Sequence, residues 1–177
     1  MARDASGLNV GSSVARLLNA PVRAGVVTWI GLRPERRQQL VAVPCAELNP
    51  EDGLVGDHYR GRGDKARQVT LIQAEHVGAI AAYLGGDPIE PDRLRRNIVV
   101  SGINLHALKG RRFRLGSALL LATGECHPCS RMEEILGPGG YNAVRGHGGI
   151  TARVVEAGRV CVGDSVARDD DPDSTLR

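Results

Sequence analysis

The feature that most restricts the fold is a series of short β-like runs separated by glycine-rich turns. The 177-residue chain contains 23 glycines, and many of the stretches between them are rich in Val, Ile, Leu and Thr. These stretches are residues 22–32, 39–45, 68–72, 97–100, 112–123, 151–156 and 159–162. Many short strands with turn signals between them are typical of a barrel or a bent sheet. The pattern therefore predicts a mainly β core.

Helical periodicity is confined to a small part of the chain. Residues 73–84 place apolar side chains at helical spacing and end before a pair of glycines. A second helix is expected to begin at Ser130. Strands and helices do not alternate regularly, which argues against a doubly wound sheet. We expect an α+β chain, mainly β with two or three attached helices.

The length of the chain favours a single domain with loose ends. Residues 1–21 mix Gly, Ser, Asn and Ala, and we expect a flexible N-terminal segment there. The globular domain is expected to span residues 22–167. Residues 168–177 are acidic, and we expect them to form a disordered tail.

Charge and aromatic content restrict the classes of partner. The net charge is only +3 and aromatic residues make up 3% of the chain, so we expect no nucleic-acid partner. Of the 23 basic residues, Lys65 and Lys109 are the lysines and the other 21 are arginines. Arginine binds phosphate and carboxylate with two parallel hydrogen bonds, so the excess suits an anionic ligand. Codon bias in a GC-rich genome explains it equally well.

The chain has no apolar run long enough to cross a bilayer and no secretory core after its first residues, so we expect a cytoplasmic protein with no membrane partner. Its four cysteines are then expected to be reduced thiols. Cys45 and Cys161 each lie alone in an apolar run, and we expect them to be core residues.

The segment Cys126-His127-Pro128-Cys129 lies between an apolar strand and the second expected helix. Ser130 and Glu133 have the spacing of a capping box, which places Cys129 immediately before the helix start. Free backbone N–H groups and the positive end of the helix dipole favour a thiolate there, and Arg131 and His127 add positive charge nearby. We therefore expect Cys129 to be accessible and reactive.

Other interpretations of this cysteine pair remain open. Two cysteines at this spacing can form half of a structural zinc site, although Cys45 and Cys161 do not provide the matching half. A redox pair of the thioredoxin type normally accompanies a βαβ unit, which the chain lacks. Cys129 can also be a small buried apolar residue with no chemistry.

Further candidate binding residues lie in glycine-rich loops or at strand starts, where the backbone can approach a ligand closely. Residues 137–142 and 145–149 form two such loops, although plain turns have the same composition. Neither loop matches a P-loop or a dinucleotide-binding fingerprint. The isolated residues His76 and His106 are interpreted as surface or structural. The candidate binding residues are Asp57, His58, Arg67, Arg96, Asn97, Arg145, Gly146, His147 and Gly148.

Four segments together resemble the MOSC family, which is named after the C-terminal domain of molybdenum cofactor sulfurase. The segments are residues 56–58 with 67–69, residues 96–98 with Gly102, residues 126–129, and residues 146–154 with 162–164. The resemblance covers about residues 22–167. It implies a MOSC-type β-barrel similar to the β-barrel of pyruvate kinase.

The resemblance also implies a function. Family members bind molybdenum cofactor, a phosphorylated pterin dithiolene, and the matching cysteine, Cys129 here, acts as molybdenum ligand or as persulfide sulfur carrier. Some members reduce N-hydroxylated or N-oxide-type small molecules with electrons from separate redox proteins. We accordingly expect a small-molecule substrate and a separate sulfur or electron donor, with either a molybdenum-dependent oxidoreductase or a sulfurtransferase activity.

Two family features are not expected in this chain. The pyridoxal-phosphate desulfurase domain of the sulfurase has no counterpart, and we do not expect pyridoxal phosphate to bind because Lys65 and Lys109 lie in no recognisable Schiff-base site. The additional N-terminal domain of the mitochondrial amidoxime reductases is also missing, so cofactor contacts made there cannot be transferred.

Two alternatives to a molybdenum-binding protein remain. One is a metal-free thiol redox or sulfur-carrier protein, in which Cys126 resolves intermediates formed at Cys129. The other is a small-ligand or partner-binding domain in which Cys129 is inert.

Overall fold

A closed barrel forms the centre of the molecule in this computed structural model, which describes residues 9, 11–59 and 63–170. Residues 25–26 pair with residues 165–166, which closes seven strands of the main sheet into a ring without a free edge. Neighbours are antiparallel except β5 and β6, which are parallel. In their order around the barrel the strands are β1 (Gly25–Leu32), β11 (Ser165–Arg168), β7 (Arg112–Leu115), β8 (Ala118–Glu125), β9 (Ile150–Glu156), β5 (Val69–Gln73) and β6 (Ile98–Ser101).

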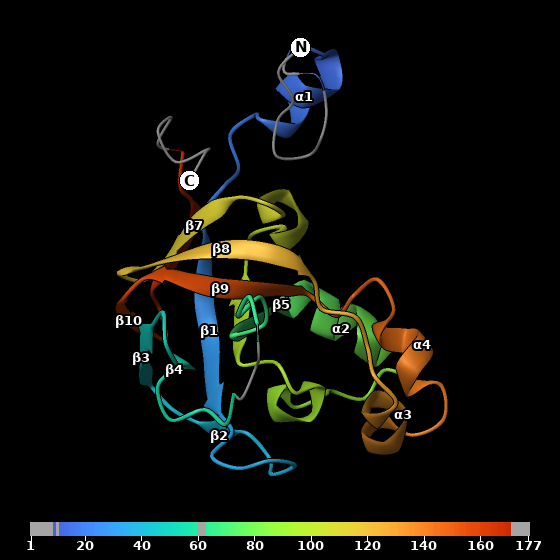
Figure 1. Cartoon of the computed structure of the whole chain (residues 1–177). Coiled ribbons are helices and arrows are strands. Elements are labelled where there is room, and N and C mark those ends of the chain that lie inside the picture. Colours follow the sequence, from blue (N-terminus) through green and yellow to red (C-terminus); the bar gives the residue numbers. More distant parts are fainter. Residues whose placement is uncertain (1–8, 10, 60–62, 171–177) are drawn as a thin grey trace.

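Short strands outside the barrel continue or cover it. Strand β2 (Val41–Ala42) extends the sheet beyond the end of β1. A separate sheet contains β10 (Gly158–Cys161), β3 (Cys45–Asn49) and β4 (Gly53–Leu54). This small sheet lies on the opposite side of the barrel from the helices α2 to α4 (Figure 1).

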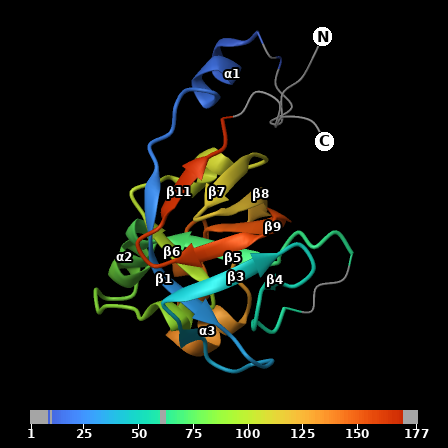
Figure 2. The same ribbon diagram turned by 90° about the vertical axis from the view of Figure 1, so that its left-hand side faces the viewer.

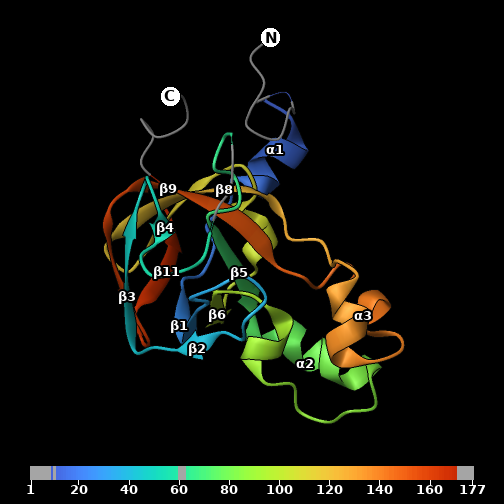
Figure 3. The same cartoon turned by 60° about the horizontal axis from the view of Figure 1, so that its bottom comes forward.

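Three helices gather on one side of the barrel, as two views agree (Figures 1 and 3). Helix α2 follows directly from β5, and α3 and α4 follow β8. Helix α1 lies apart from them, beyond one end of the barrel (Figure 2). The helices are α1 (Ser13–Leu18), α2 (Ala74–Tyr83), α3 (Arg131–Leu136) and α4 (Gly140–Val144), with 3₁₀ turns η1 (Pro91–Leu94) and η2 (Leu105–Leu108).

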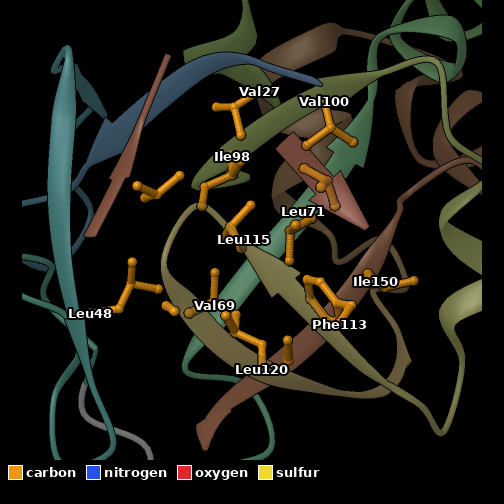
Figure 4. Close-up of a cluster of buried hydrophobic side chains, with 14 of the residues drawn as sticks. Val27, Leu48, Val69, Leu71, Ile98, Val100, Phe113, Leu115, Leu120 and Ile150 are labelled. Atoms are coloured by element: carbon orange, nitrogen blue, oxygen red, sulfur yellow. The ribbon is translucent and has the colours of Figure 1, made fainter. Parts of the chain in front are cut away.

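Two apolar clusters explain why the central strands are continuous hydrophobic runs. The first fills the barrel and includes Leu71, Ile98 and Phe113, whose side chains converge in Figure 4. The second lies between barrel and helices and includes Ile72 and Val99. Successive residues of a strand point to opposite faces, so β5 and β6 are buried on both sides. Such strands lose the polar alternation of a half-exposed sheet.

The predicted strands and helices are largely confirmed, with two clear errors. Residues 112–123 were expected to form one strand, but they form the hairpin β7–β8. Gly116 adopts φ +57° at the turn, and a Cβ there would lie 2.4 Å from the carbonyl oxygen of Arg159. An apolar composition on both sides of a single glycine hid this turn. The strand expected at residues 39–45 is also incorrect, because only β2 and the first residue of β3 fall within it and β3 continues to Asn49. Strands β4 and β11 and helix α4 were not predicted.

The expectation for Cys45 and Cys161 is wrong, because these residues form a disulfide rather than two reduced core thiols. They face each other directly on the antiparallel strands β3 and β10, with their Cα atoms 4.0 Å apart. The two residues are 116 positions apart in the chain, so no local pattern reveals the pairing. The disulfide links the strand that leads toward Asp57 to the C-terminal part of the chain.

Both ends of the chain contain regular structure. In the N-terminal segment expected to be flexible, residues 13–18 form α1, whose N-cap is the hydroxyl of Ser12. In the expected acidic tail, Arg168 completes β11 and donates to the carbonyl of Asn19 over 3.1 Å. The rest of that tail, residues 171–177, lies outside the described residues, as do residues 1–8 and 10.

Candidate functional site

Segments distant in sequence meet at the end of the barrel where β1 leads toward β2, beside helix α3 (Figure 1). They are the end of β1, the loop before β5, the turn between η1 and β6, and the loop between β8 and α3. The chain reverses or enters a helix at each of these points, so their side chains are free to face one space. We call this space the cysteine cavity.

The cysteine cavity has a volume of about 400 Å³ and brings together most of the residues singled out from the sequence. Its lining residues are Arg33, Asp57, Tyr59, Asp64, Ala66, Arg67, Gln68, Thr70, Arg95, Arg96, Asn97, Cys126, His127 and Cys129. Thiols, arginines and neutral hydrogen-bonding groups therefore surround one volume, whose size suits a small molecule.

The two cysteines of the cavity differ in accessibility. Both are free, but Cys129 is exposed whereas Cys126 is buried. The Sγ atom of Cys126 lies 3.8 Å from a guanidinium nitrogen of Arg67, within the range of a sulfur hydrogen bond. A ligand entering the cavity would therefore reach the thiol of Cys129 first.

The capping box predicted at the start of α3 does not form. Ser130 has helical dihedral angles and its side chain makes no capping hydrogen bond. The Glu133 carboxylate instead accepts hydrogen bonds of 2.8 Å from the amides of Gly139 and Tyr141. These bonds lower the pKa of Glu133. The prediction failed because α4 follows so closely that its free amides compete for the same carboxylate, so no capping box forms next to Cys129.

Positive charge near Cys129 comes instead from arginines on other segments. Arg95 lines the cavity and makes no side-chain hydrogen bond or ion pair with any part of the chain that the structure describes. Burial is the main cause that lowers the pKa of Arg95, followed by the neighbouring charges of Arg33 and Arg131, while Cys129 raises it. The guanidinium of Arg95 therefore lies close enough to Cys129 for the two groups to interact electrostatically.

Arg96 was expected to contact an anion, but its guanidinium is surrounded by backbone carbonyl groups of the protein. Its buried guanidinium donates to the carbonyl oxygens of Gly148 at 2.7 Å, Leu94 at 2.9 Å and Cys126 at 3.1 Å. Arg96 thus fastens the cysteine loop to the loop before β9. A Cβ on Gly148 would lie 2.0 Å from the oxygen of Cys126, so glycine is needed for this close approach. Arg67 and Arg95 are freer to bind an anion.

The expected site residues Asp57 and Asn97 form the floor of the cavity. Asp57 Oδ1 accepts hydrogen bonds from the amide of Arg33 at 2.7 Å and from Asn97 Nδ2 at 3.1 Å. Asn97 Oδ1 in turn accepts from the hydroxyl of Thr70 at 2.8 Å. These bonds join four parts of the chain and hold the floor in place. His58 lies just outside it, with its amide 2.6 Å from the carbonyl oxygen of Arg33.

The structure does not bring Arg145, Gly146, His147 or Gly148 into the lining of the cysteine cavity. Arg145 is exposed and hydrogen-bonds to Asn142 over 3.4 Å. The ring of His147 lies 4.8 Å from that of His76 and 5.4 Å from that of Tyr83. The loop before β9 therefore places His147 beside α2 and Arg145 beside α4, while its later glycines approach the cysteine loop.

A histidine cluster replaces the isolated histidines predicted from the sequence. His76 lies between His147 and His106, whose ring centroid is 6.2 Å away. Nδ1 of His76 and Nδ1 of His147 are buried without a hydrogen-bond partner within the described ranges. Burial is the largest cause that lowers the pKa of His76, followed by the charges of His147 and His106, while Glu75 and a backbone hydrogen bond oppose the shift.

This lowered pKa predicts a loss of stability in mild acid. Below about pH 6.5, the ordinary histidine pKa, His76 becomes protonated in the unfolded chain but stays neutral in the folded protein. The free energy of unfolding therefore decreases as the pH is lowered through this range. Urea unfolding at pH 7.5 and 5.5 measures the effect. His76→Gln is expected to reduce the pH dependence, and His127→Gln, an exposed histidine outside the cluster, serves as control. An unchanged pH dependence in His76→Gln would contradict the assignment.

A second cavity, the arginine cavity, adjoins the first and was not predicted. Its volume is about 780 Å³, and Arg33 and Arg95 line both cavities. Its lining residues are Arg33, Arg36, Arg37, His58, Arg95, Ser130, Arg131 and Glu134. The available signal was the arginine-rich stretch of residues 33–37 directly after a predicted strand.

The donor groups of the site do not form a conventional metal site. Among residues 9, 11–59 and 63–170, no group of three His, Cys, Asp or Glu side chains is arranged to hold a metal ion. A metal bound at Cys129 would therefore take most of its ligands from a cofactor or from solvent. None of the helices in the described ranges is long and apolar enough to span a membrane.

Solved structures with the same fold confirm the architecture. The chain is similar to the YuaD protein of Bacillus subtilis, with 22% identity, a TM-score of 0.72, and coverage of 82% of this chain and 95% of that one. YiiM of Geobacillus stearothermophilus gives 16% identity and a TM-score of 0.67, covering 83% and 75%. YiiM of Escherichia coli gives 18% and 0.61, covering 84% and 69%.

Sequence comparison identifies the family. No curated protein sequence matches the chain. The family model described as MOSC domain matches residues 58–167, which is more than half of the chain and includes most of the cysteine cavity. The MOSC-type barrel expected from the sequence is thereby confirmed, and the chain belongs to the MOSC domain family.

Proposed function

We propose that the protein binds molybdenum cofactor in the cysteine cavity, with the Cys129 thiolate as molybdenum ligand or sulfur carrier. The observation that carries the proposal is the position of Cys129, an exposed free thiol that shares one cavity with Arg67 and Arg95. A thiolate is the form of cysteine that binds metals and transfers sulfur. The association of the MOSC family with this cofactor supports the proposal.

The donor set of the cavity fits this cofactor. A dithiolene carries its own sulfur ligands, so a single protein thiolate from Cys129 would complete the protein's share of the coordination. Arg67 and Arg95 would bind the phosphate of the pterin, because guanidinium groups match phosphate geometry. The hydrogen bond between Asp57 and Asn97 would hold the lining of the cavity in place for the cofactor, and Arg96 keeps the cysteine loop in position.

The bound cofactor would supply a centre for two-electron redox chemistry or for sulfur transfer to a small molecule. We infer that the substrate is an N-hydroxylated or N-oxide-type compound if the protein is an oxidoreductase. Electrons, or sulfur in a sulfurtransferase, would then come from a separate protein. The chain's own residues would bind and orient the cofactor and present Cys129 to it.

The test compares the two cysteines of one cavity. Protein purified from a host that makes the cofactor is expected to contain molybdenum close to one atom per chain. Cys129→Ser should lower this content at least tenfold, a loss of about 1.4 kcal/mol or more in binding, because the ligand sulfur is removed. Cys126→Ser should retain molybdenum, since its thiol is buried beside Arg67. Elemental analysis measures both, and metal-free wild-type protein would contradict the proposal.

A metal-free thiol function is the second candidate, because both free cysteines line the same cavity. In that case Cys129 would carry a persulfide or form a mixed disulfide. The thiolate of Cys126 would attack Sγ of Cys129, breaking its bond to the outer sulfur, forming the Cys126–Cys129 disulfide and releasing hydrosulfide or the partner thiolate. Mass spectrometry after mild oxidation would detect either species in molybdenum-free protein. Thiols that stay reduced under these conditions would rule this candidate out.

A further inference from the structure

The arginine cavity holds more positive charge than its own acidic groups neutralise. Glu134 is the acidic residue in its lining, and it pairs with Arg131 at 3.5 Å. Arg33 lies 4.0 Å from the buried carboxylate of Asp57. Arg36 and Arg37 are exposed and have no ion pair with the described part of the chain.

Two of the unpaired arginines are held in an unfavourable backbone conformation. Arg37 has φ +71° and Arg95 has φ +59°, in the left-handed region that non-glycine residues rarely adopt. Thirteen glycines of the described residues have positive φ, so this chain commonly uses glycine where such angles are needed. Strained residues of this kind cluster at functional sites, because the strain persists only where the surroundings impose it. Both side chains line the arginine cavity.

Hydrogen bonds between segments fix the walls of this cavity. Gln39, at the end of the arginine-rich loop, donates to Asp92 in η1. Arg93 in turn donates to the carbonyl of Ile135 in α3 over 2.5 Å. The arginine-rich loop, η1 and α3 are therefore connected to one another in the absence of a ligand. A preformed site loses less conformational entropy when a ligand binds.

The lowered pKa of Arg95 agrees with a missing counter-charge. After burial, the largest causes are the charges of Arg33 and Arg131, which line the same cavity. An anion placed among these groups would relieve the repulsion that they exert on one another.

We propose that the arginine cavity binds a phosphate or diphosphate group of a ligand that reaches the cysteine cavity. Arg67, in the cysteine cavity, is available for the cofactor's own phosphate, whereas Arg36 and Arg37 face only the arginine cavity. A second anionic group is therefore needed to match them. This group belongs either to a nucleotide extension of the cofactor or to a phosphorylated substrate. The proposal that one ligand, or two neighbouring ones, fills both cavities rests on the proposed function.

Inorganic diphosphate is the probe for the site. Calorimetric titration of the apo full-length chain is expected to show binding that weakens at least tenfold in Arg36→Ala/Arg37→Ala. The matched control is Arg23→Ala/Arg153→Ala, which removes two exposed arginines that line neither cavity and leaves the affinity unchanged. Both double variants have the same net charge, so an equal loss in both, or no loss in either, would overturn the proposal.

The same variants separate this proposal from the proposed function. Arg36→Ala/Arg37→Ala should keep its molybdenum, whereas Cys129→Ser should lose molybdenum but still bind diphosphate. Diphosphate binding to cofactor-loaded protein would identify a phosphorylated substrate as the source. A nucleoside monophosphate released in equal amount to molybdenum on acid hydrolysis, with no diphosphate binding to the loaded protein, would identify a nucleotide extension.

Discussion

Replacing Arg96 by leucine is expected to lower the free energy of unfolding by about 3–5 kcal/mol. The guanidinium is buried and donates to three carbonyl oxygens, and leucine would leave all three unsatisfied. The carbonyls belong to Leu94, Gly148 and Cys126, so the cysteine loop would also lose its attachment. Urea unfolding measures the change in stability, and elemental analysis should show reduced molybdenum in the folded fraction.

Arg95 provides a neighbouring control with the opposite behaviour. Its side chain makes no hydrogen bond or ion pair to residues 9, 11–59 or 63–170, and its φ of +59° is readily adopted by glycine. Arg95→Gly is therefore expected to change the free energy of unfolding by less than about 1 kcal/mol, while weakening diphosphate binding. Equal destabilisation by the two substitutions would show that the structural role of Arg96 is misassigned.

Gly149→Ala is expected to destabilise the protein by about 2–5 kcal/mol, from left-handed strain and overpacking together. Gly149 has φ +81°, and a Cβ there would lie 1.9 Å from the carbonyl oxygen of Leu71 in β5. The backbone around it must therefore shift. Since the carbonyl of Gly149 accepts the amide of Cys126 at 2.9 Å, the shift would also displace the cysteine loop. Thermal and urea unfolding measure the loss.

Gly146 separates the two causes of this effect. It has φ +77° in the same loop, but a Cβ there would meet nothing within 4 Å. Gly146→Ala should therefore cost only the left-handed strain, about 1–2 kcal/mol. If the two alanine variants were equally stable, close packing against β5 would not explain the requirement for glycine at position 149.

Comparison of the sequence with the structure shows which kinds of inference succeed. The β-barrel and helix α2 were predictable because their signals are local, with apolar runs bounded by glycines and apolar residues at helical spacing. The hairpin at Gly116 and the capping of Glu133 were missed although they are also local. The hairpin turn was hidden by apolar residues on both sides of a single glycine, and the Glu133 carboxylate is bound by amides of Gly139 and Tyr141 that lie outside the expected capping box.

The cysteine motif illustrates the same division. The sequence showed that the motif lies between a strand and a helix, and it identified Cys129 as the main candidate site residue. The environment of its cysteines was not evident from the sequence, because Arg67 and Arg95 reach it from segments about 60 and 30 positions earlier in the chain. The disulfide between Cys45 and Cys161 has the same origin, since strand register places those residues opposite each other.

The sequence by itself determined the class of fold, the family and the cysteine around which the site is built. Only the tertiary structure decided that Arg96 is a buried structural residue while adjacent Arg95 lines two cavities, and that Arg145 and His147 line neither. The physical reason is that strand and helix formation depends on neighbours along the chain. Burial and charge at one side chain depend instead on which distant segments pack around it.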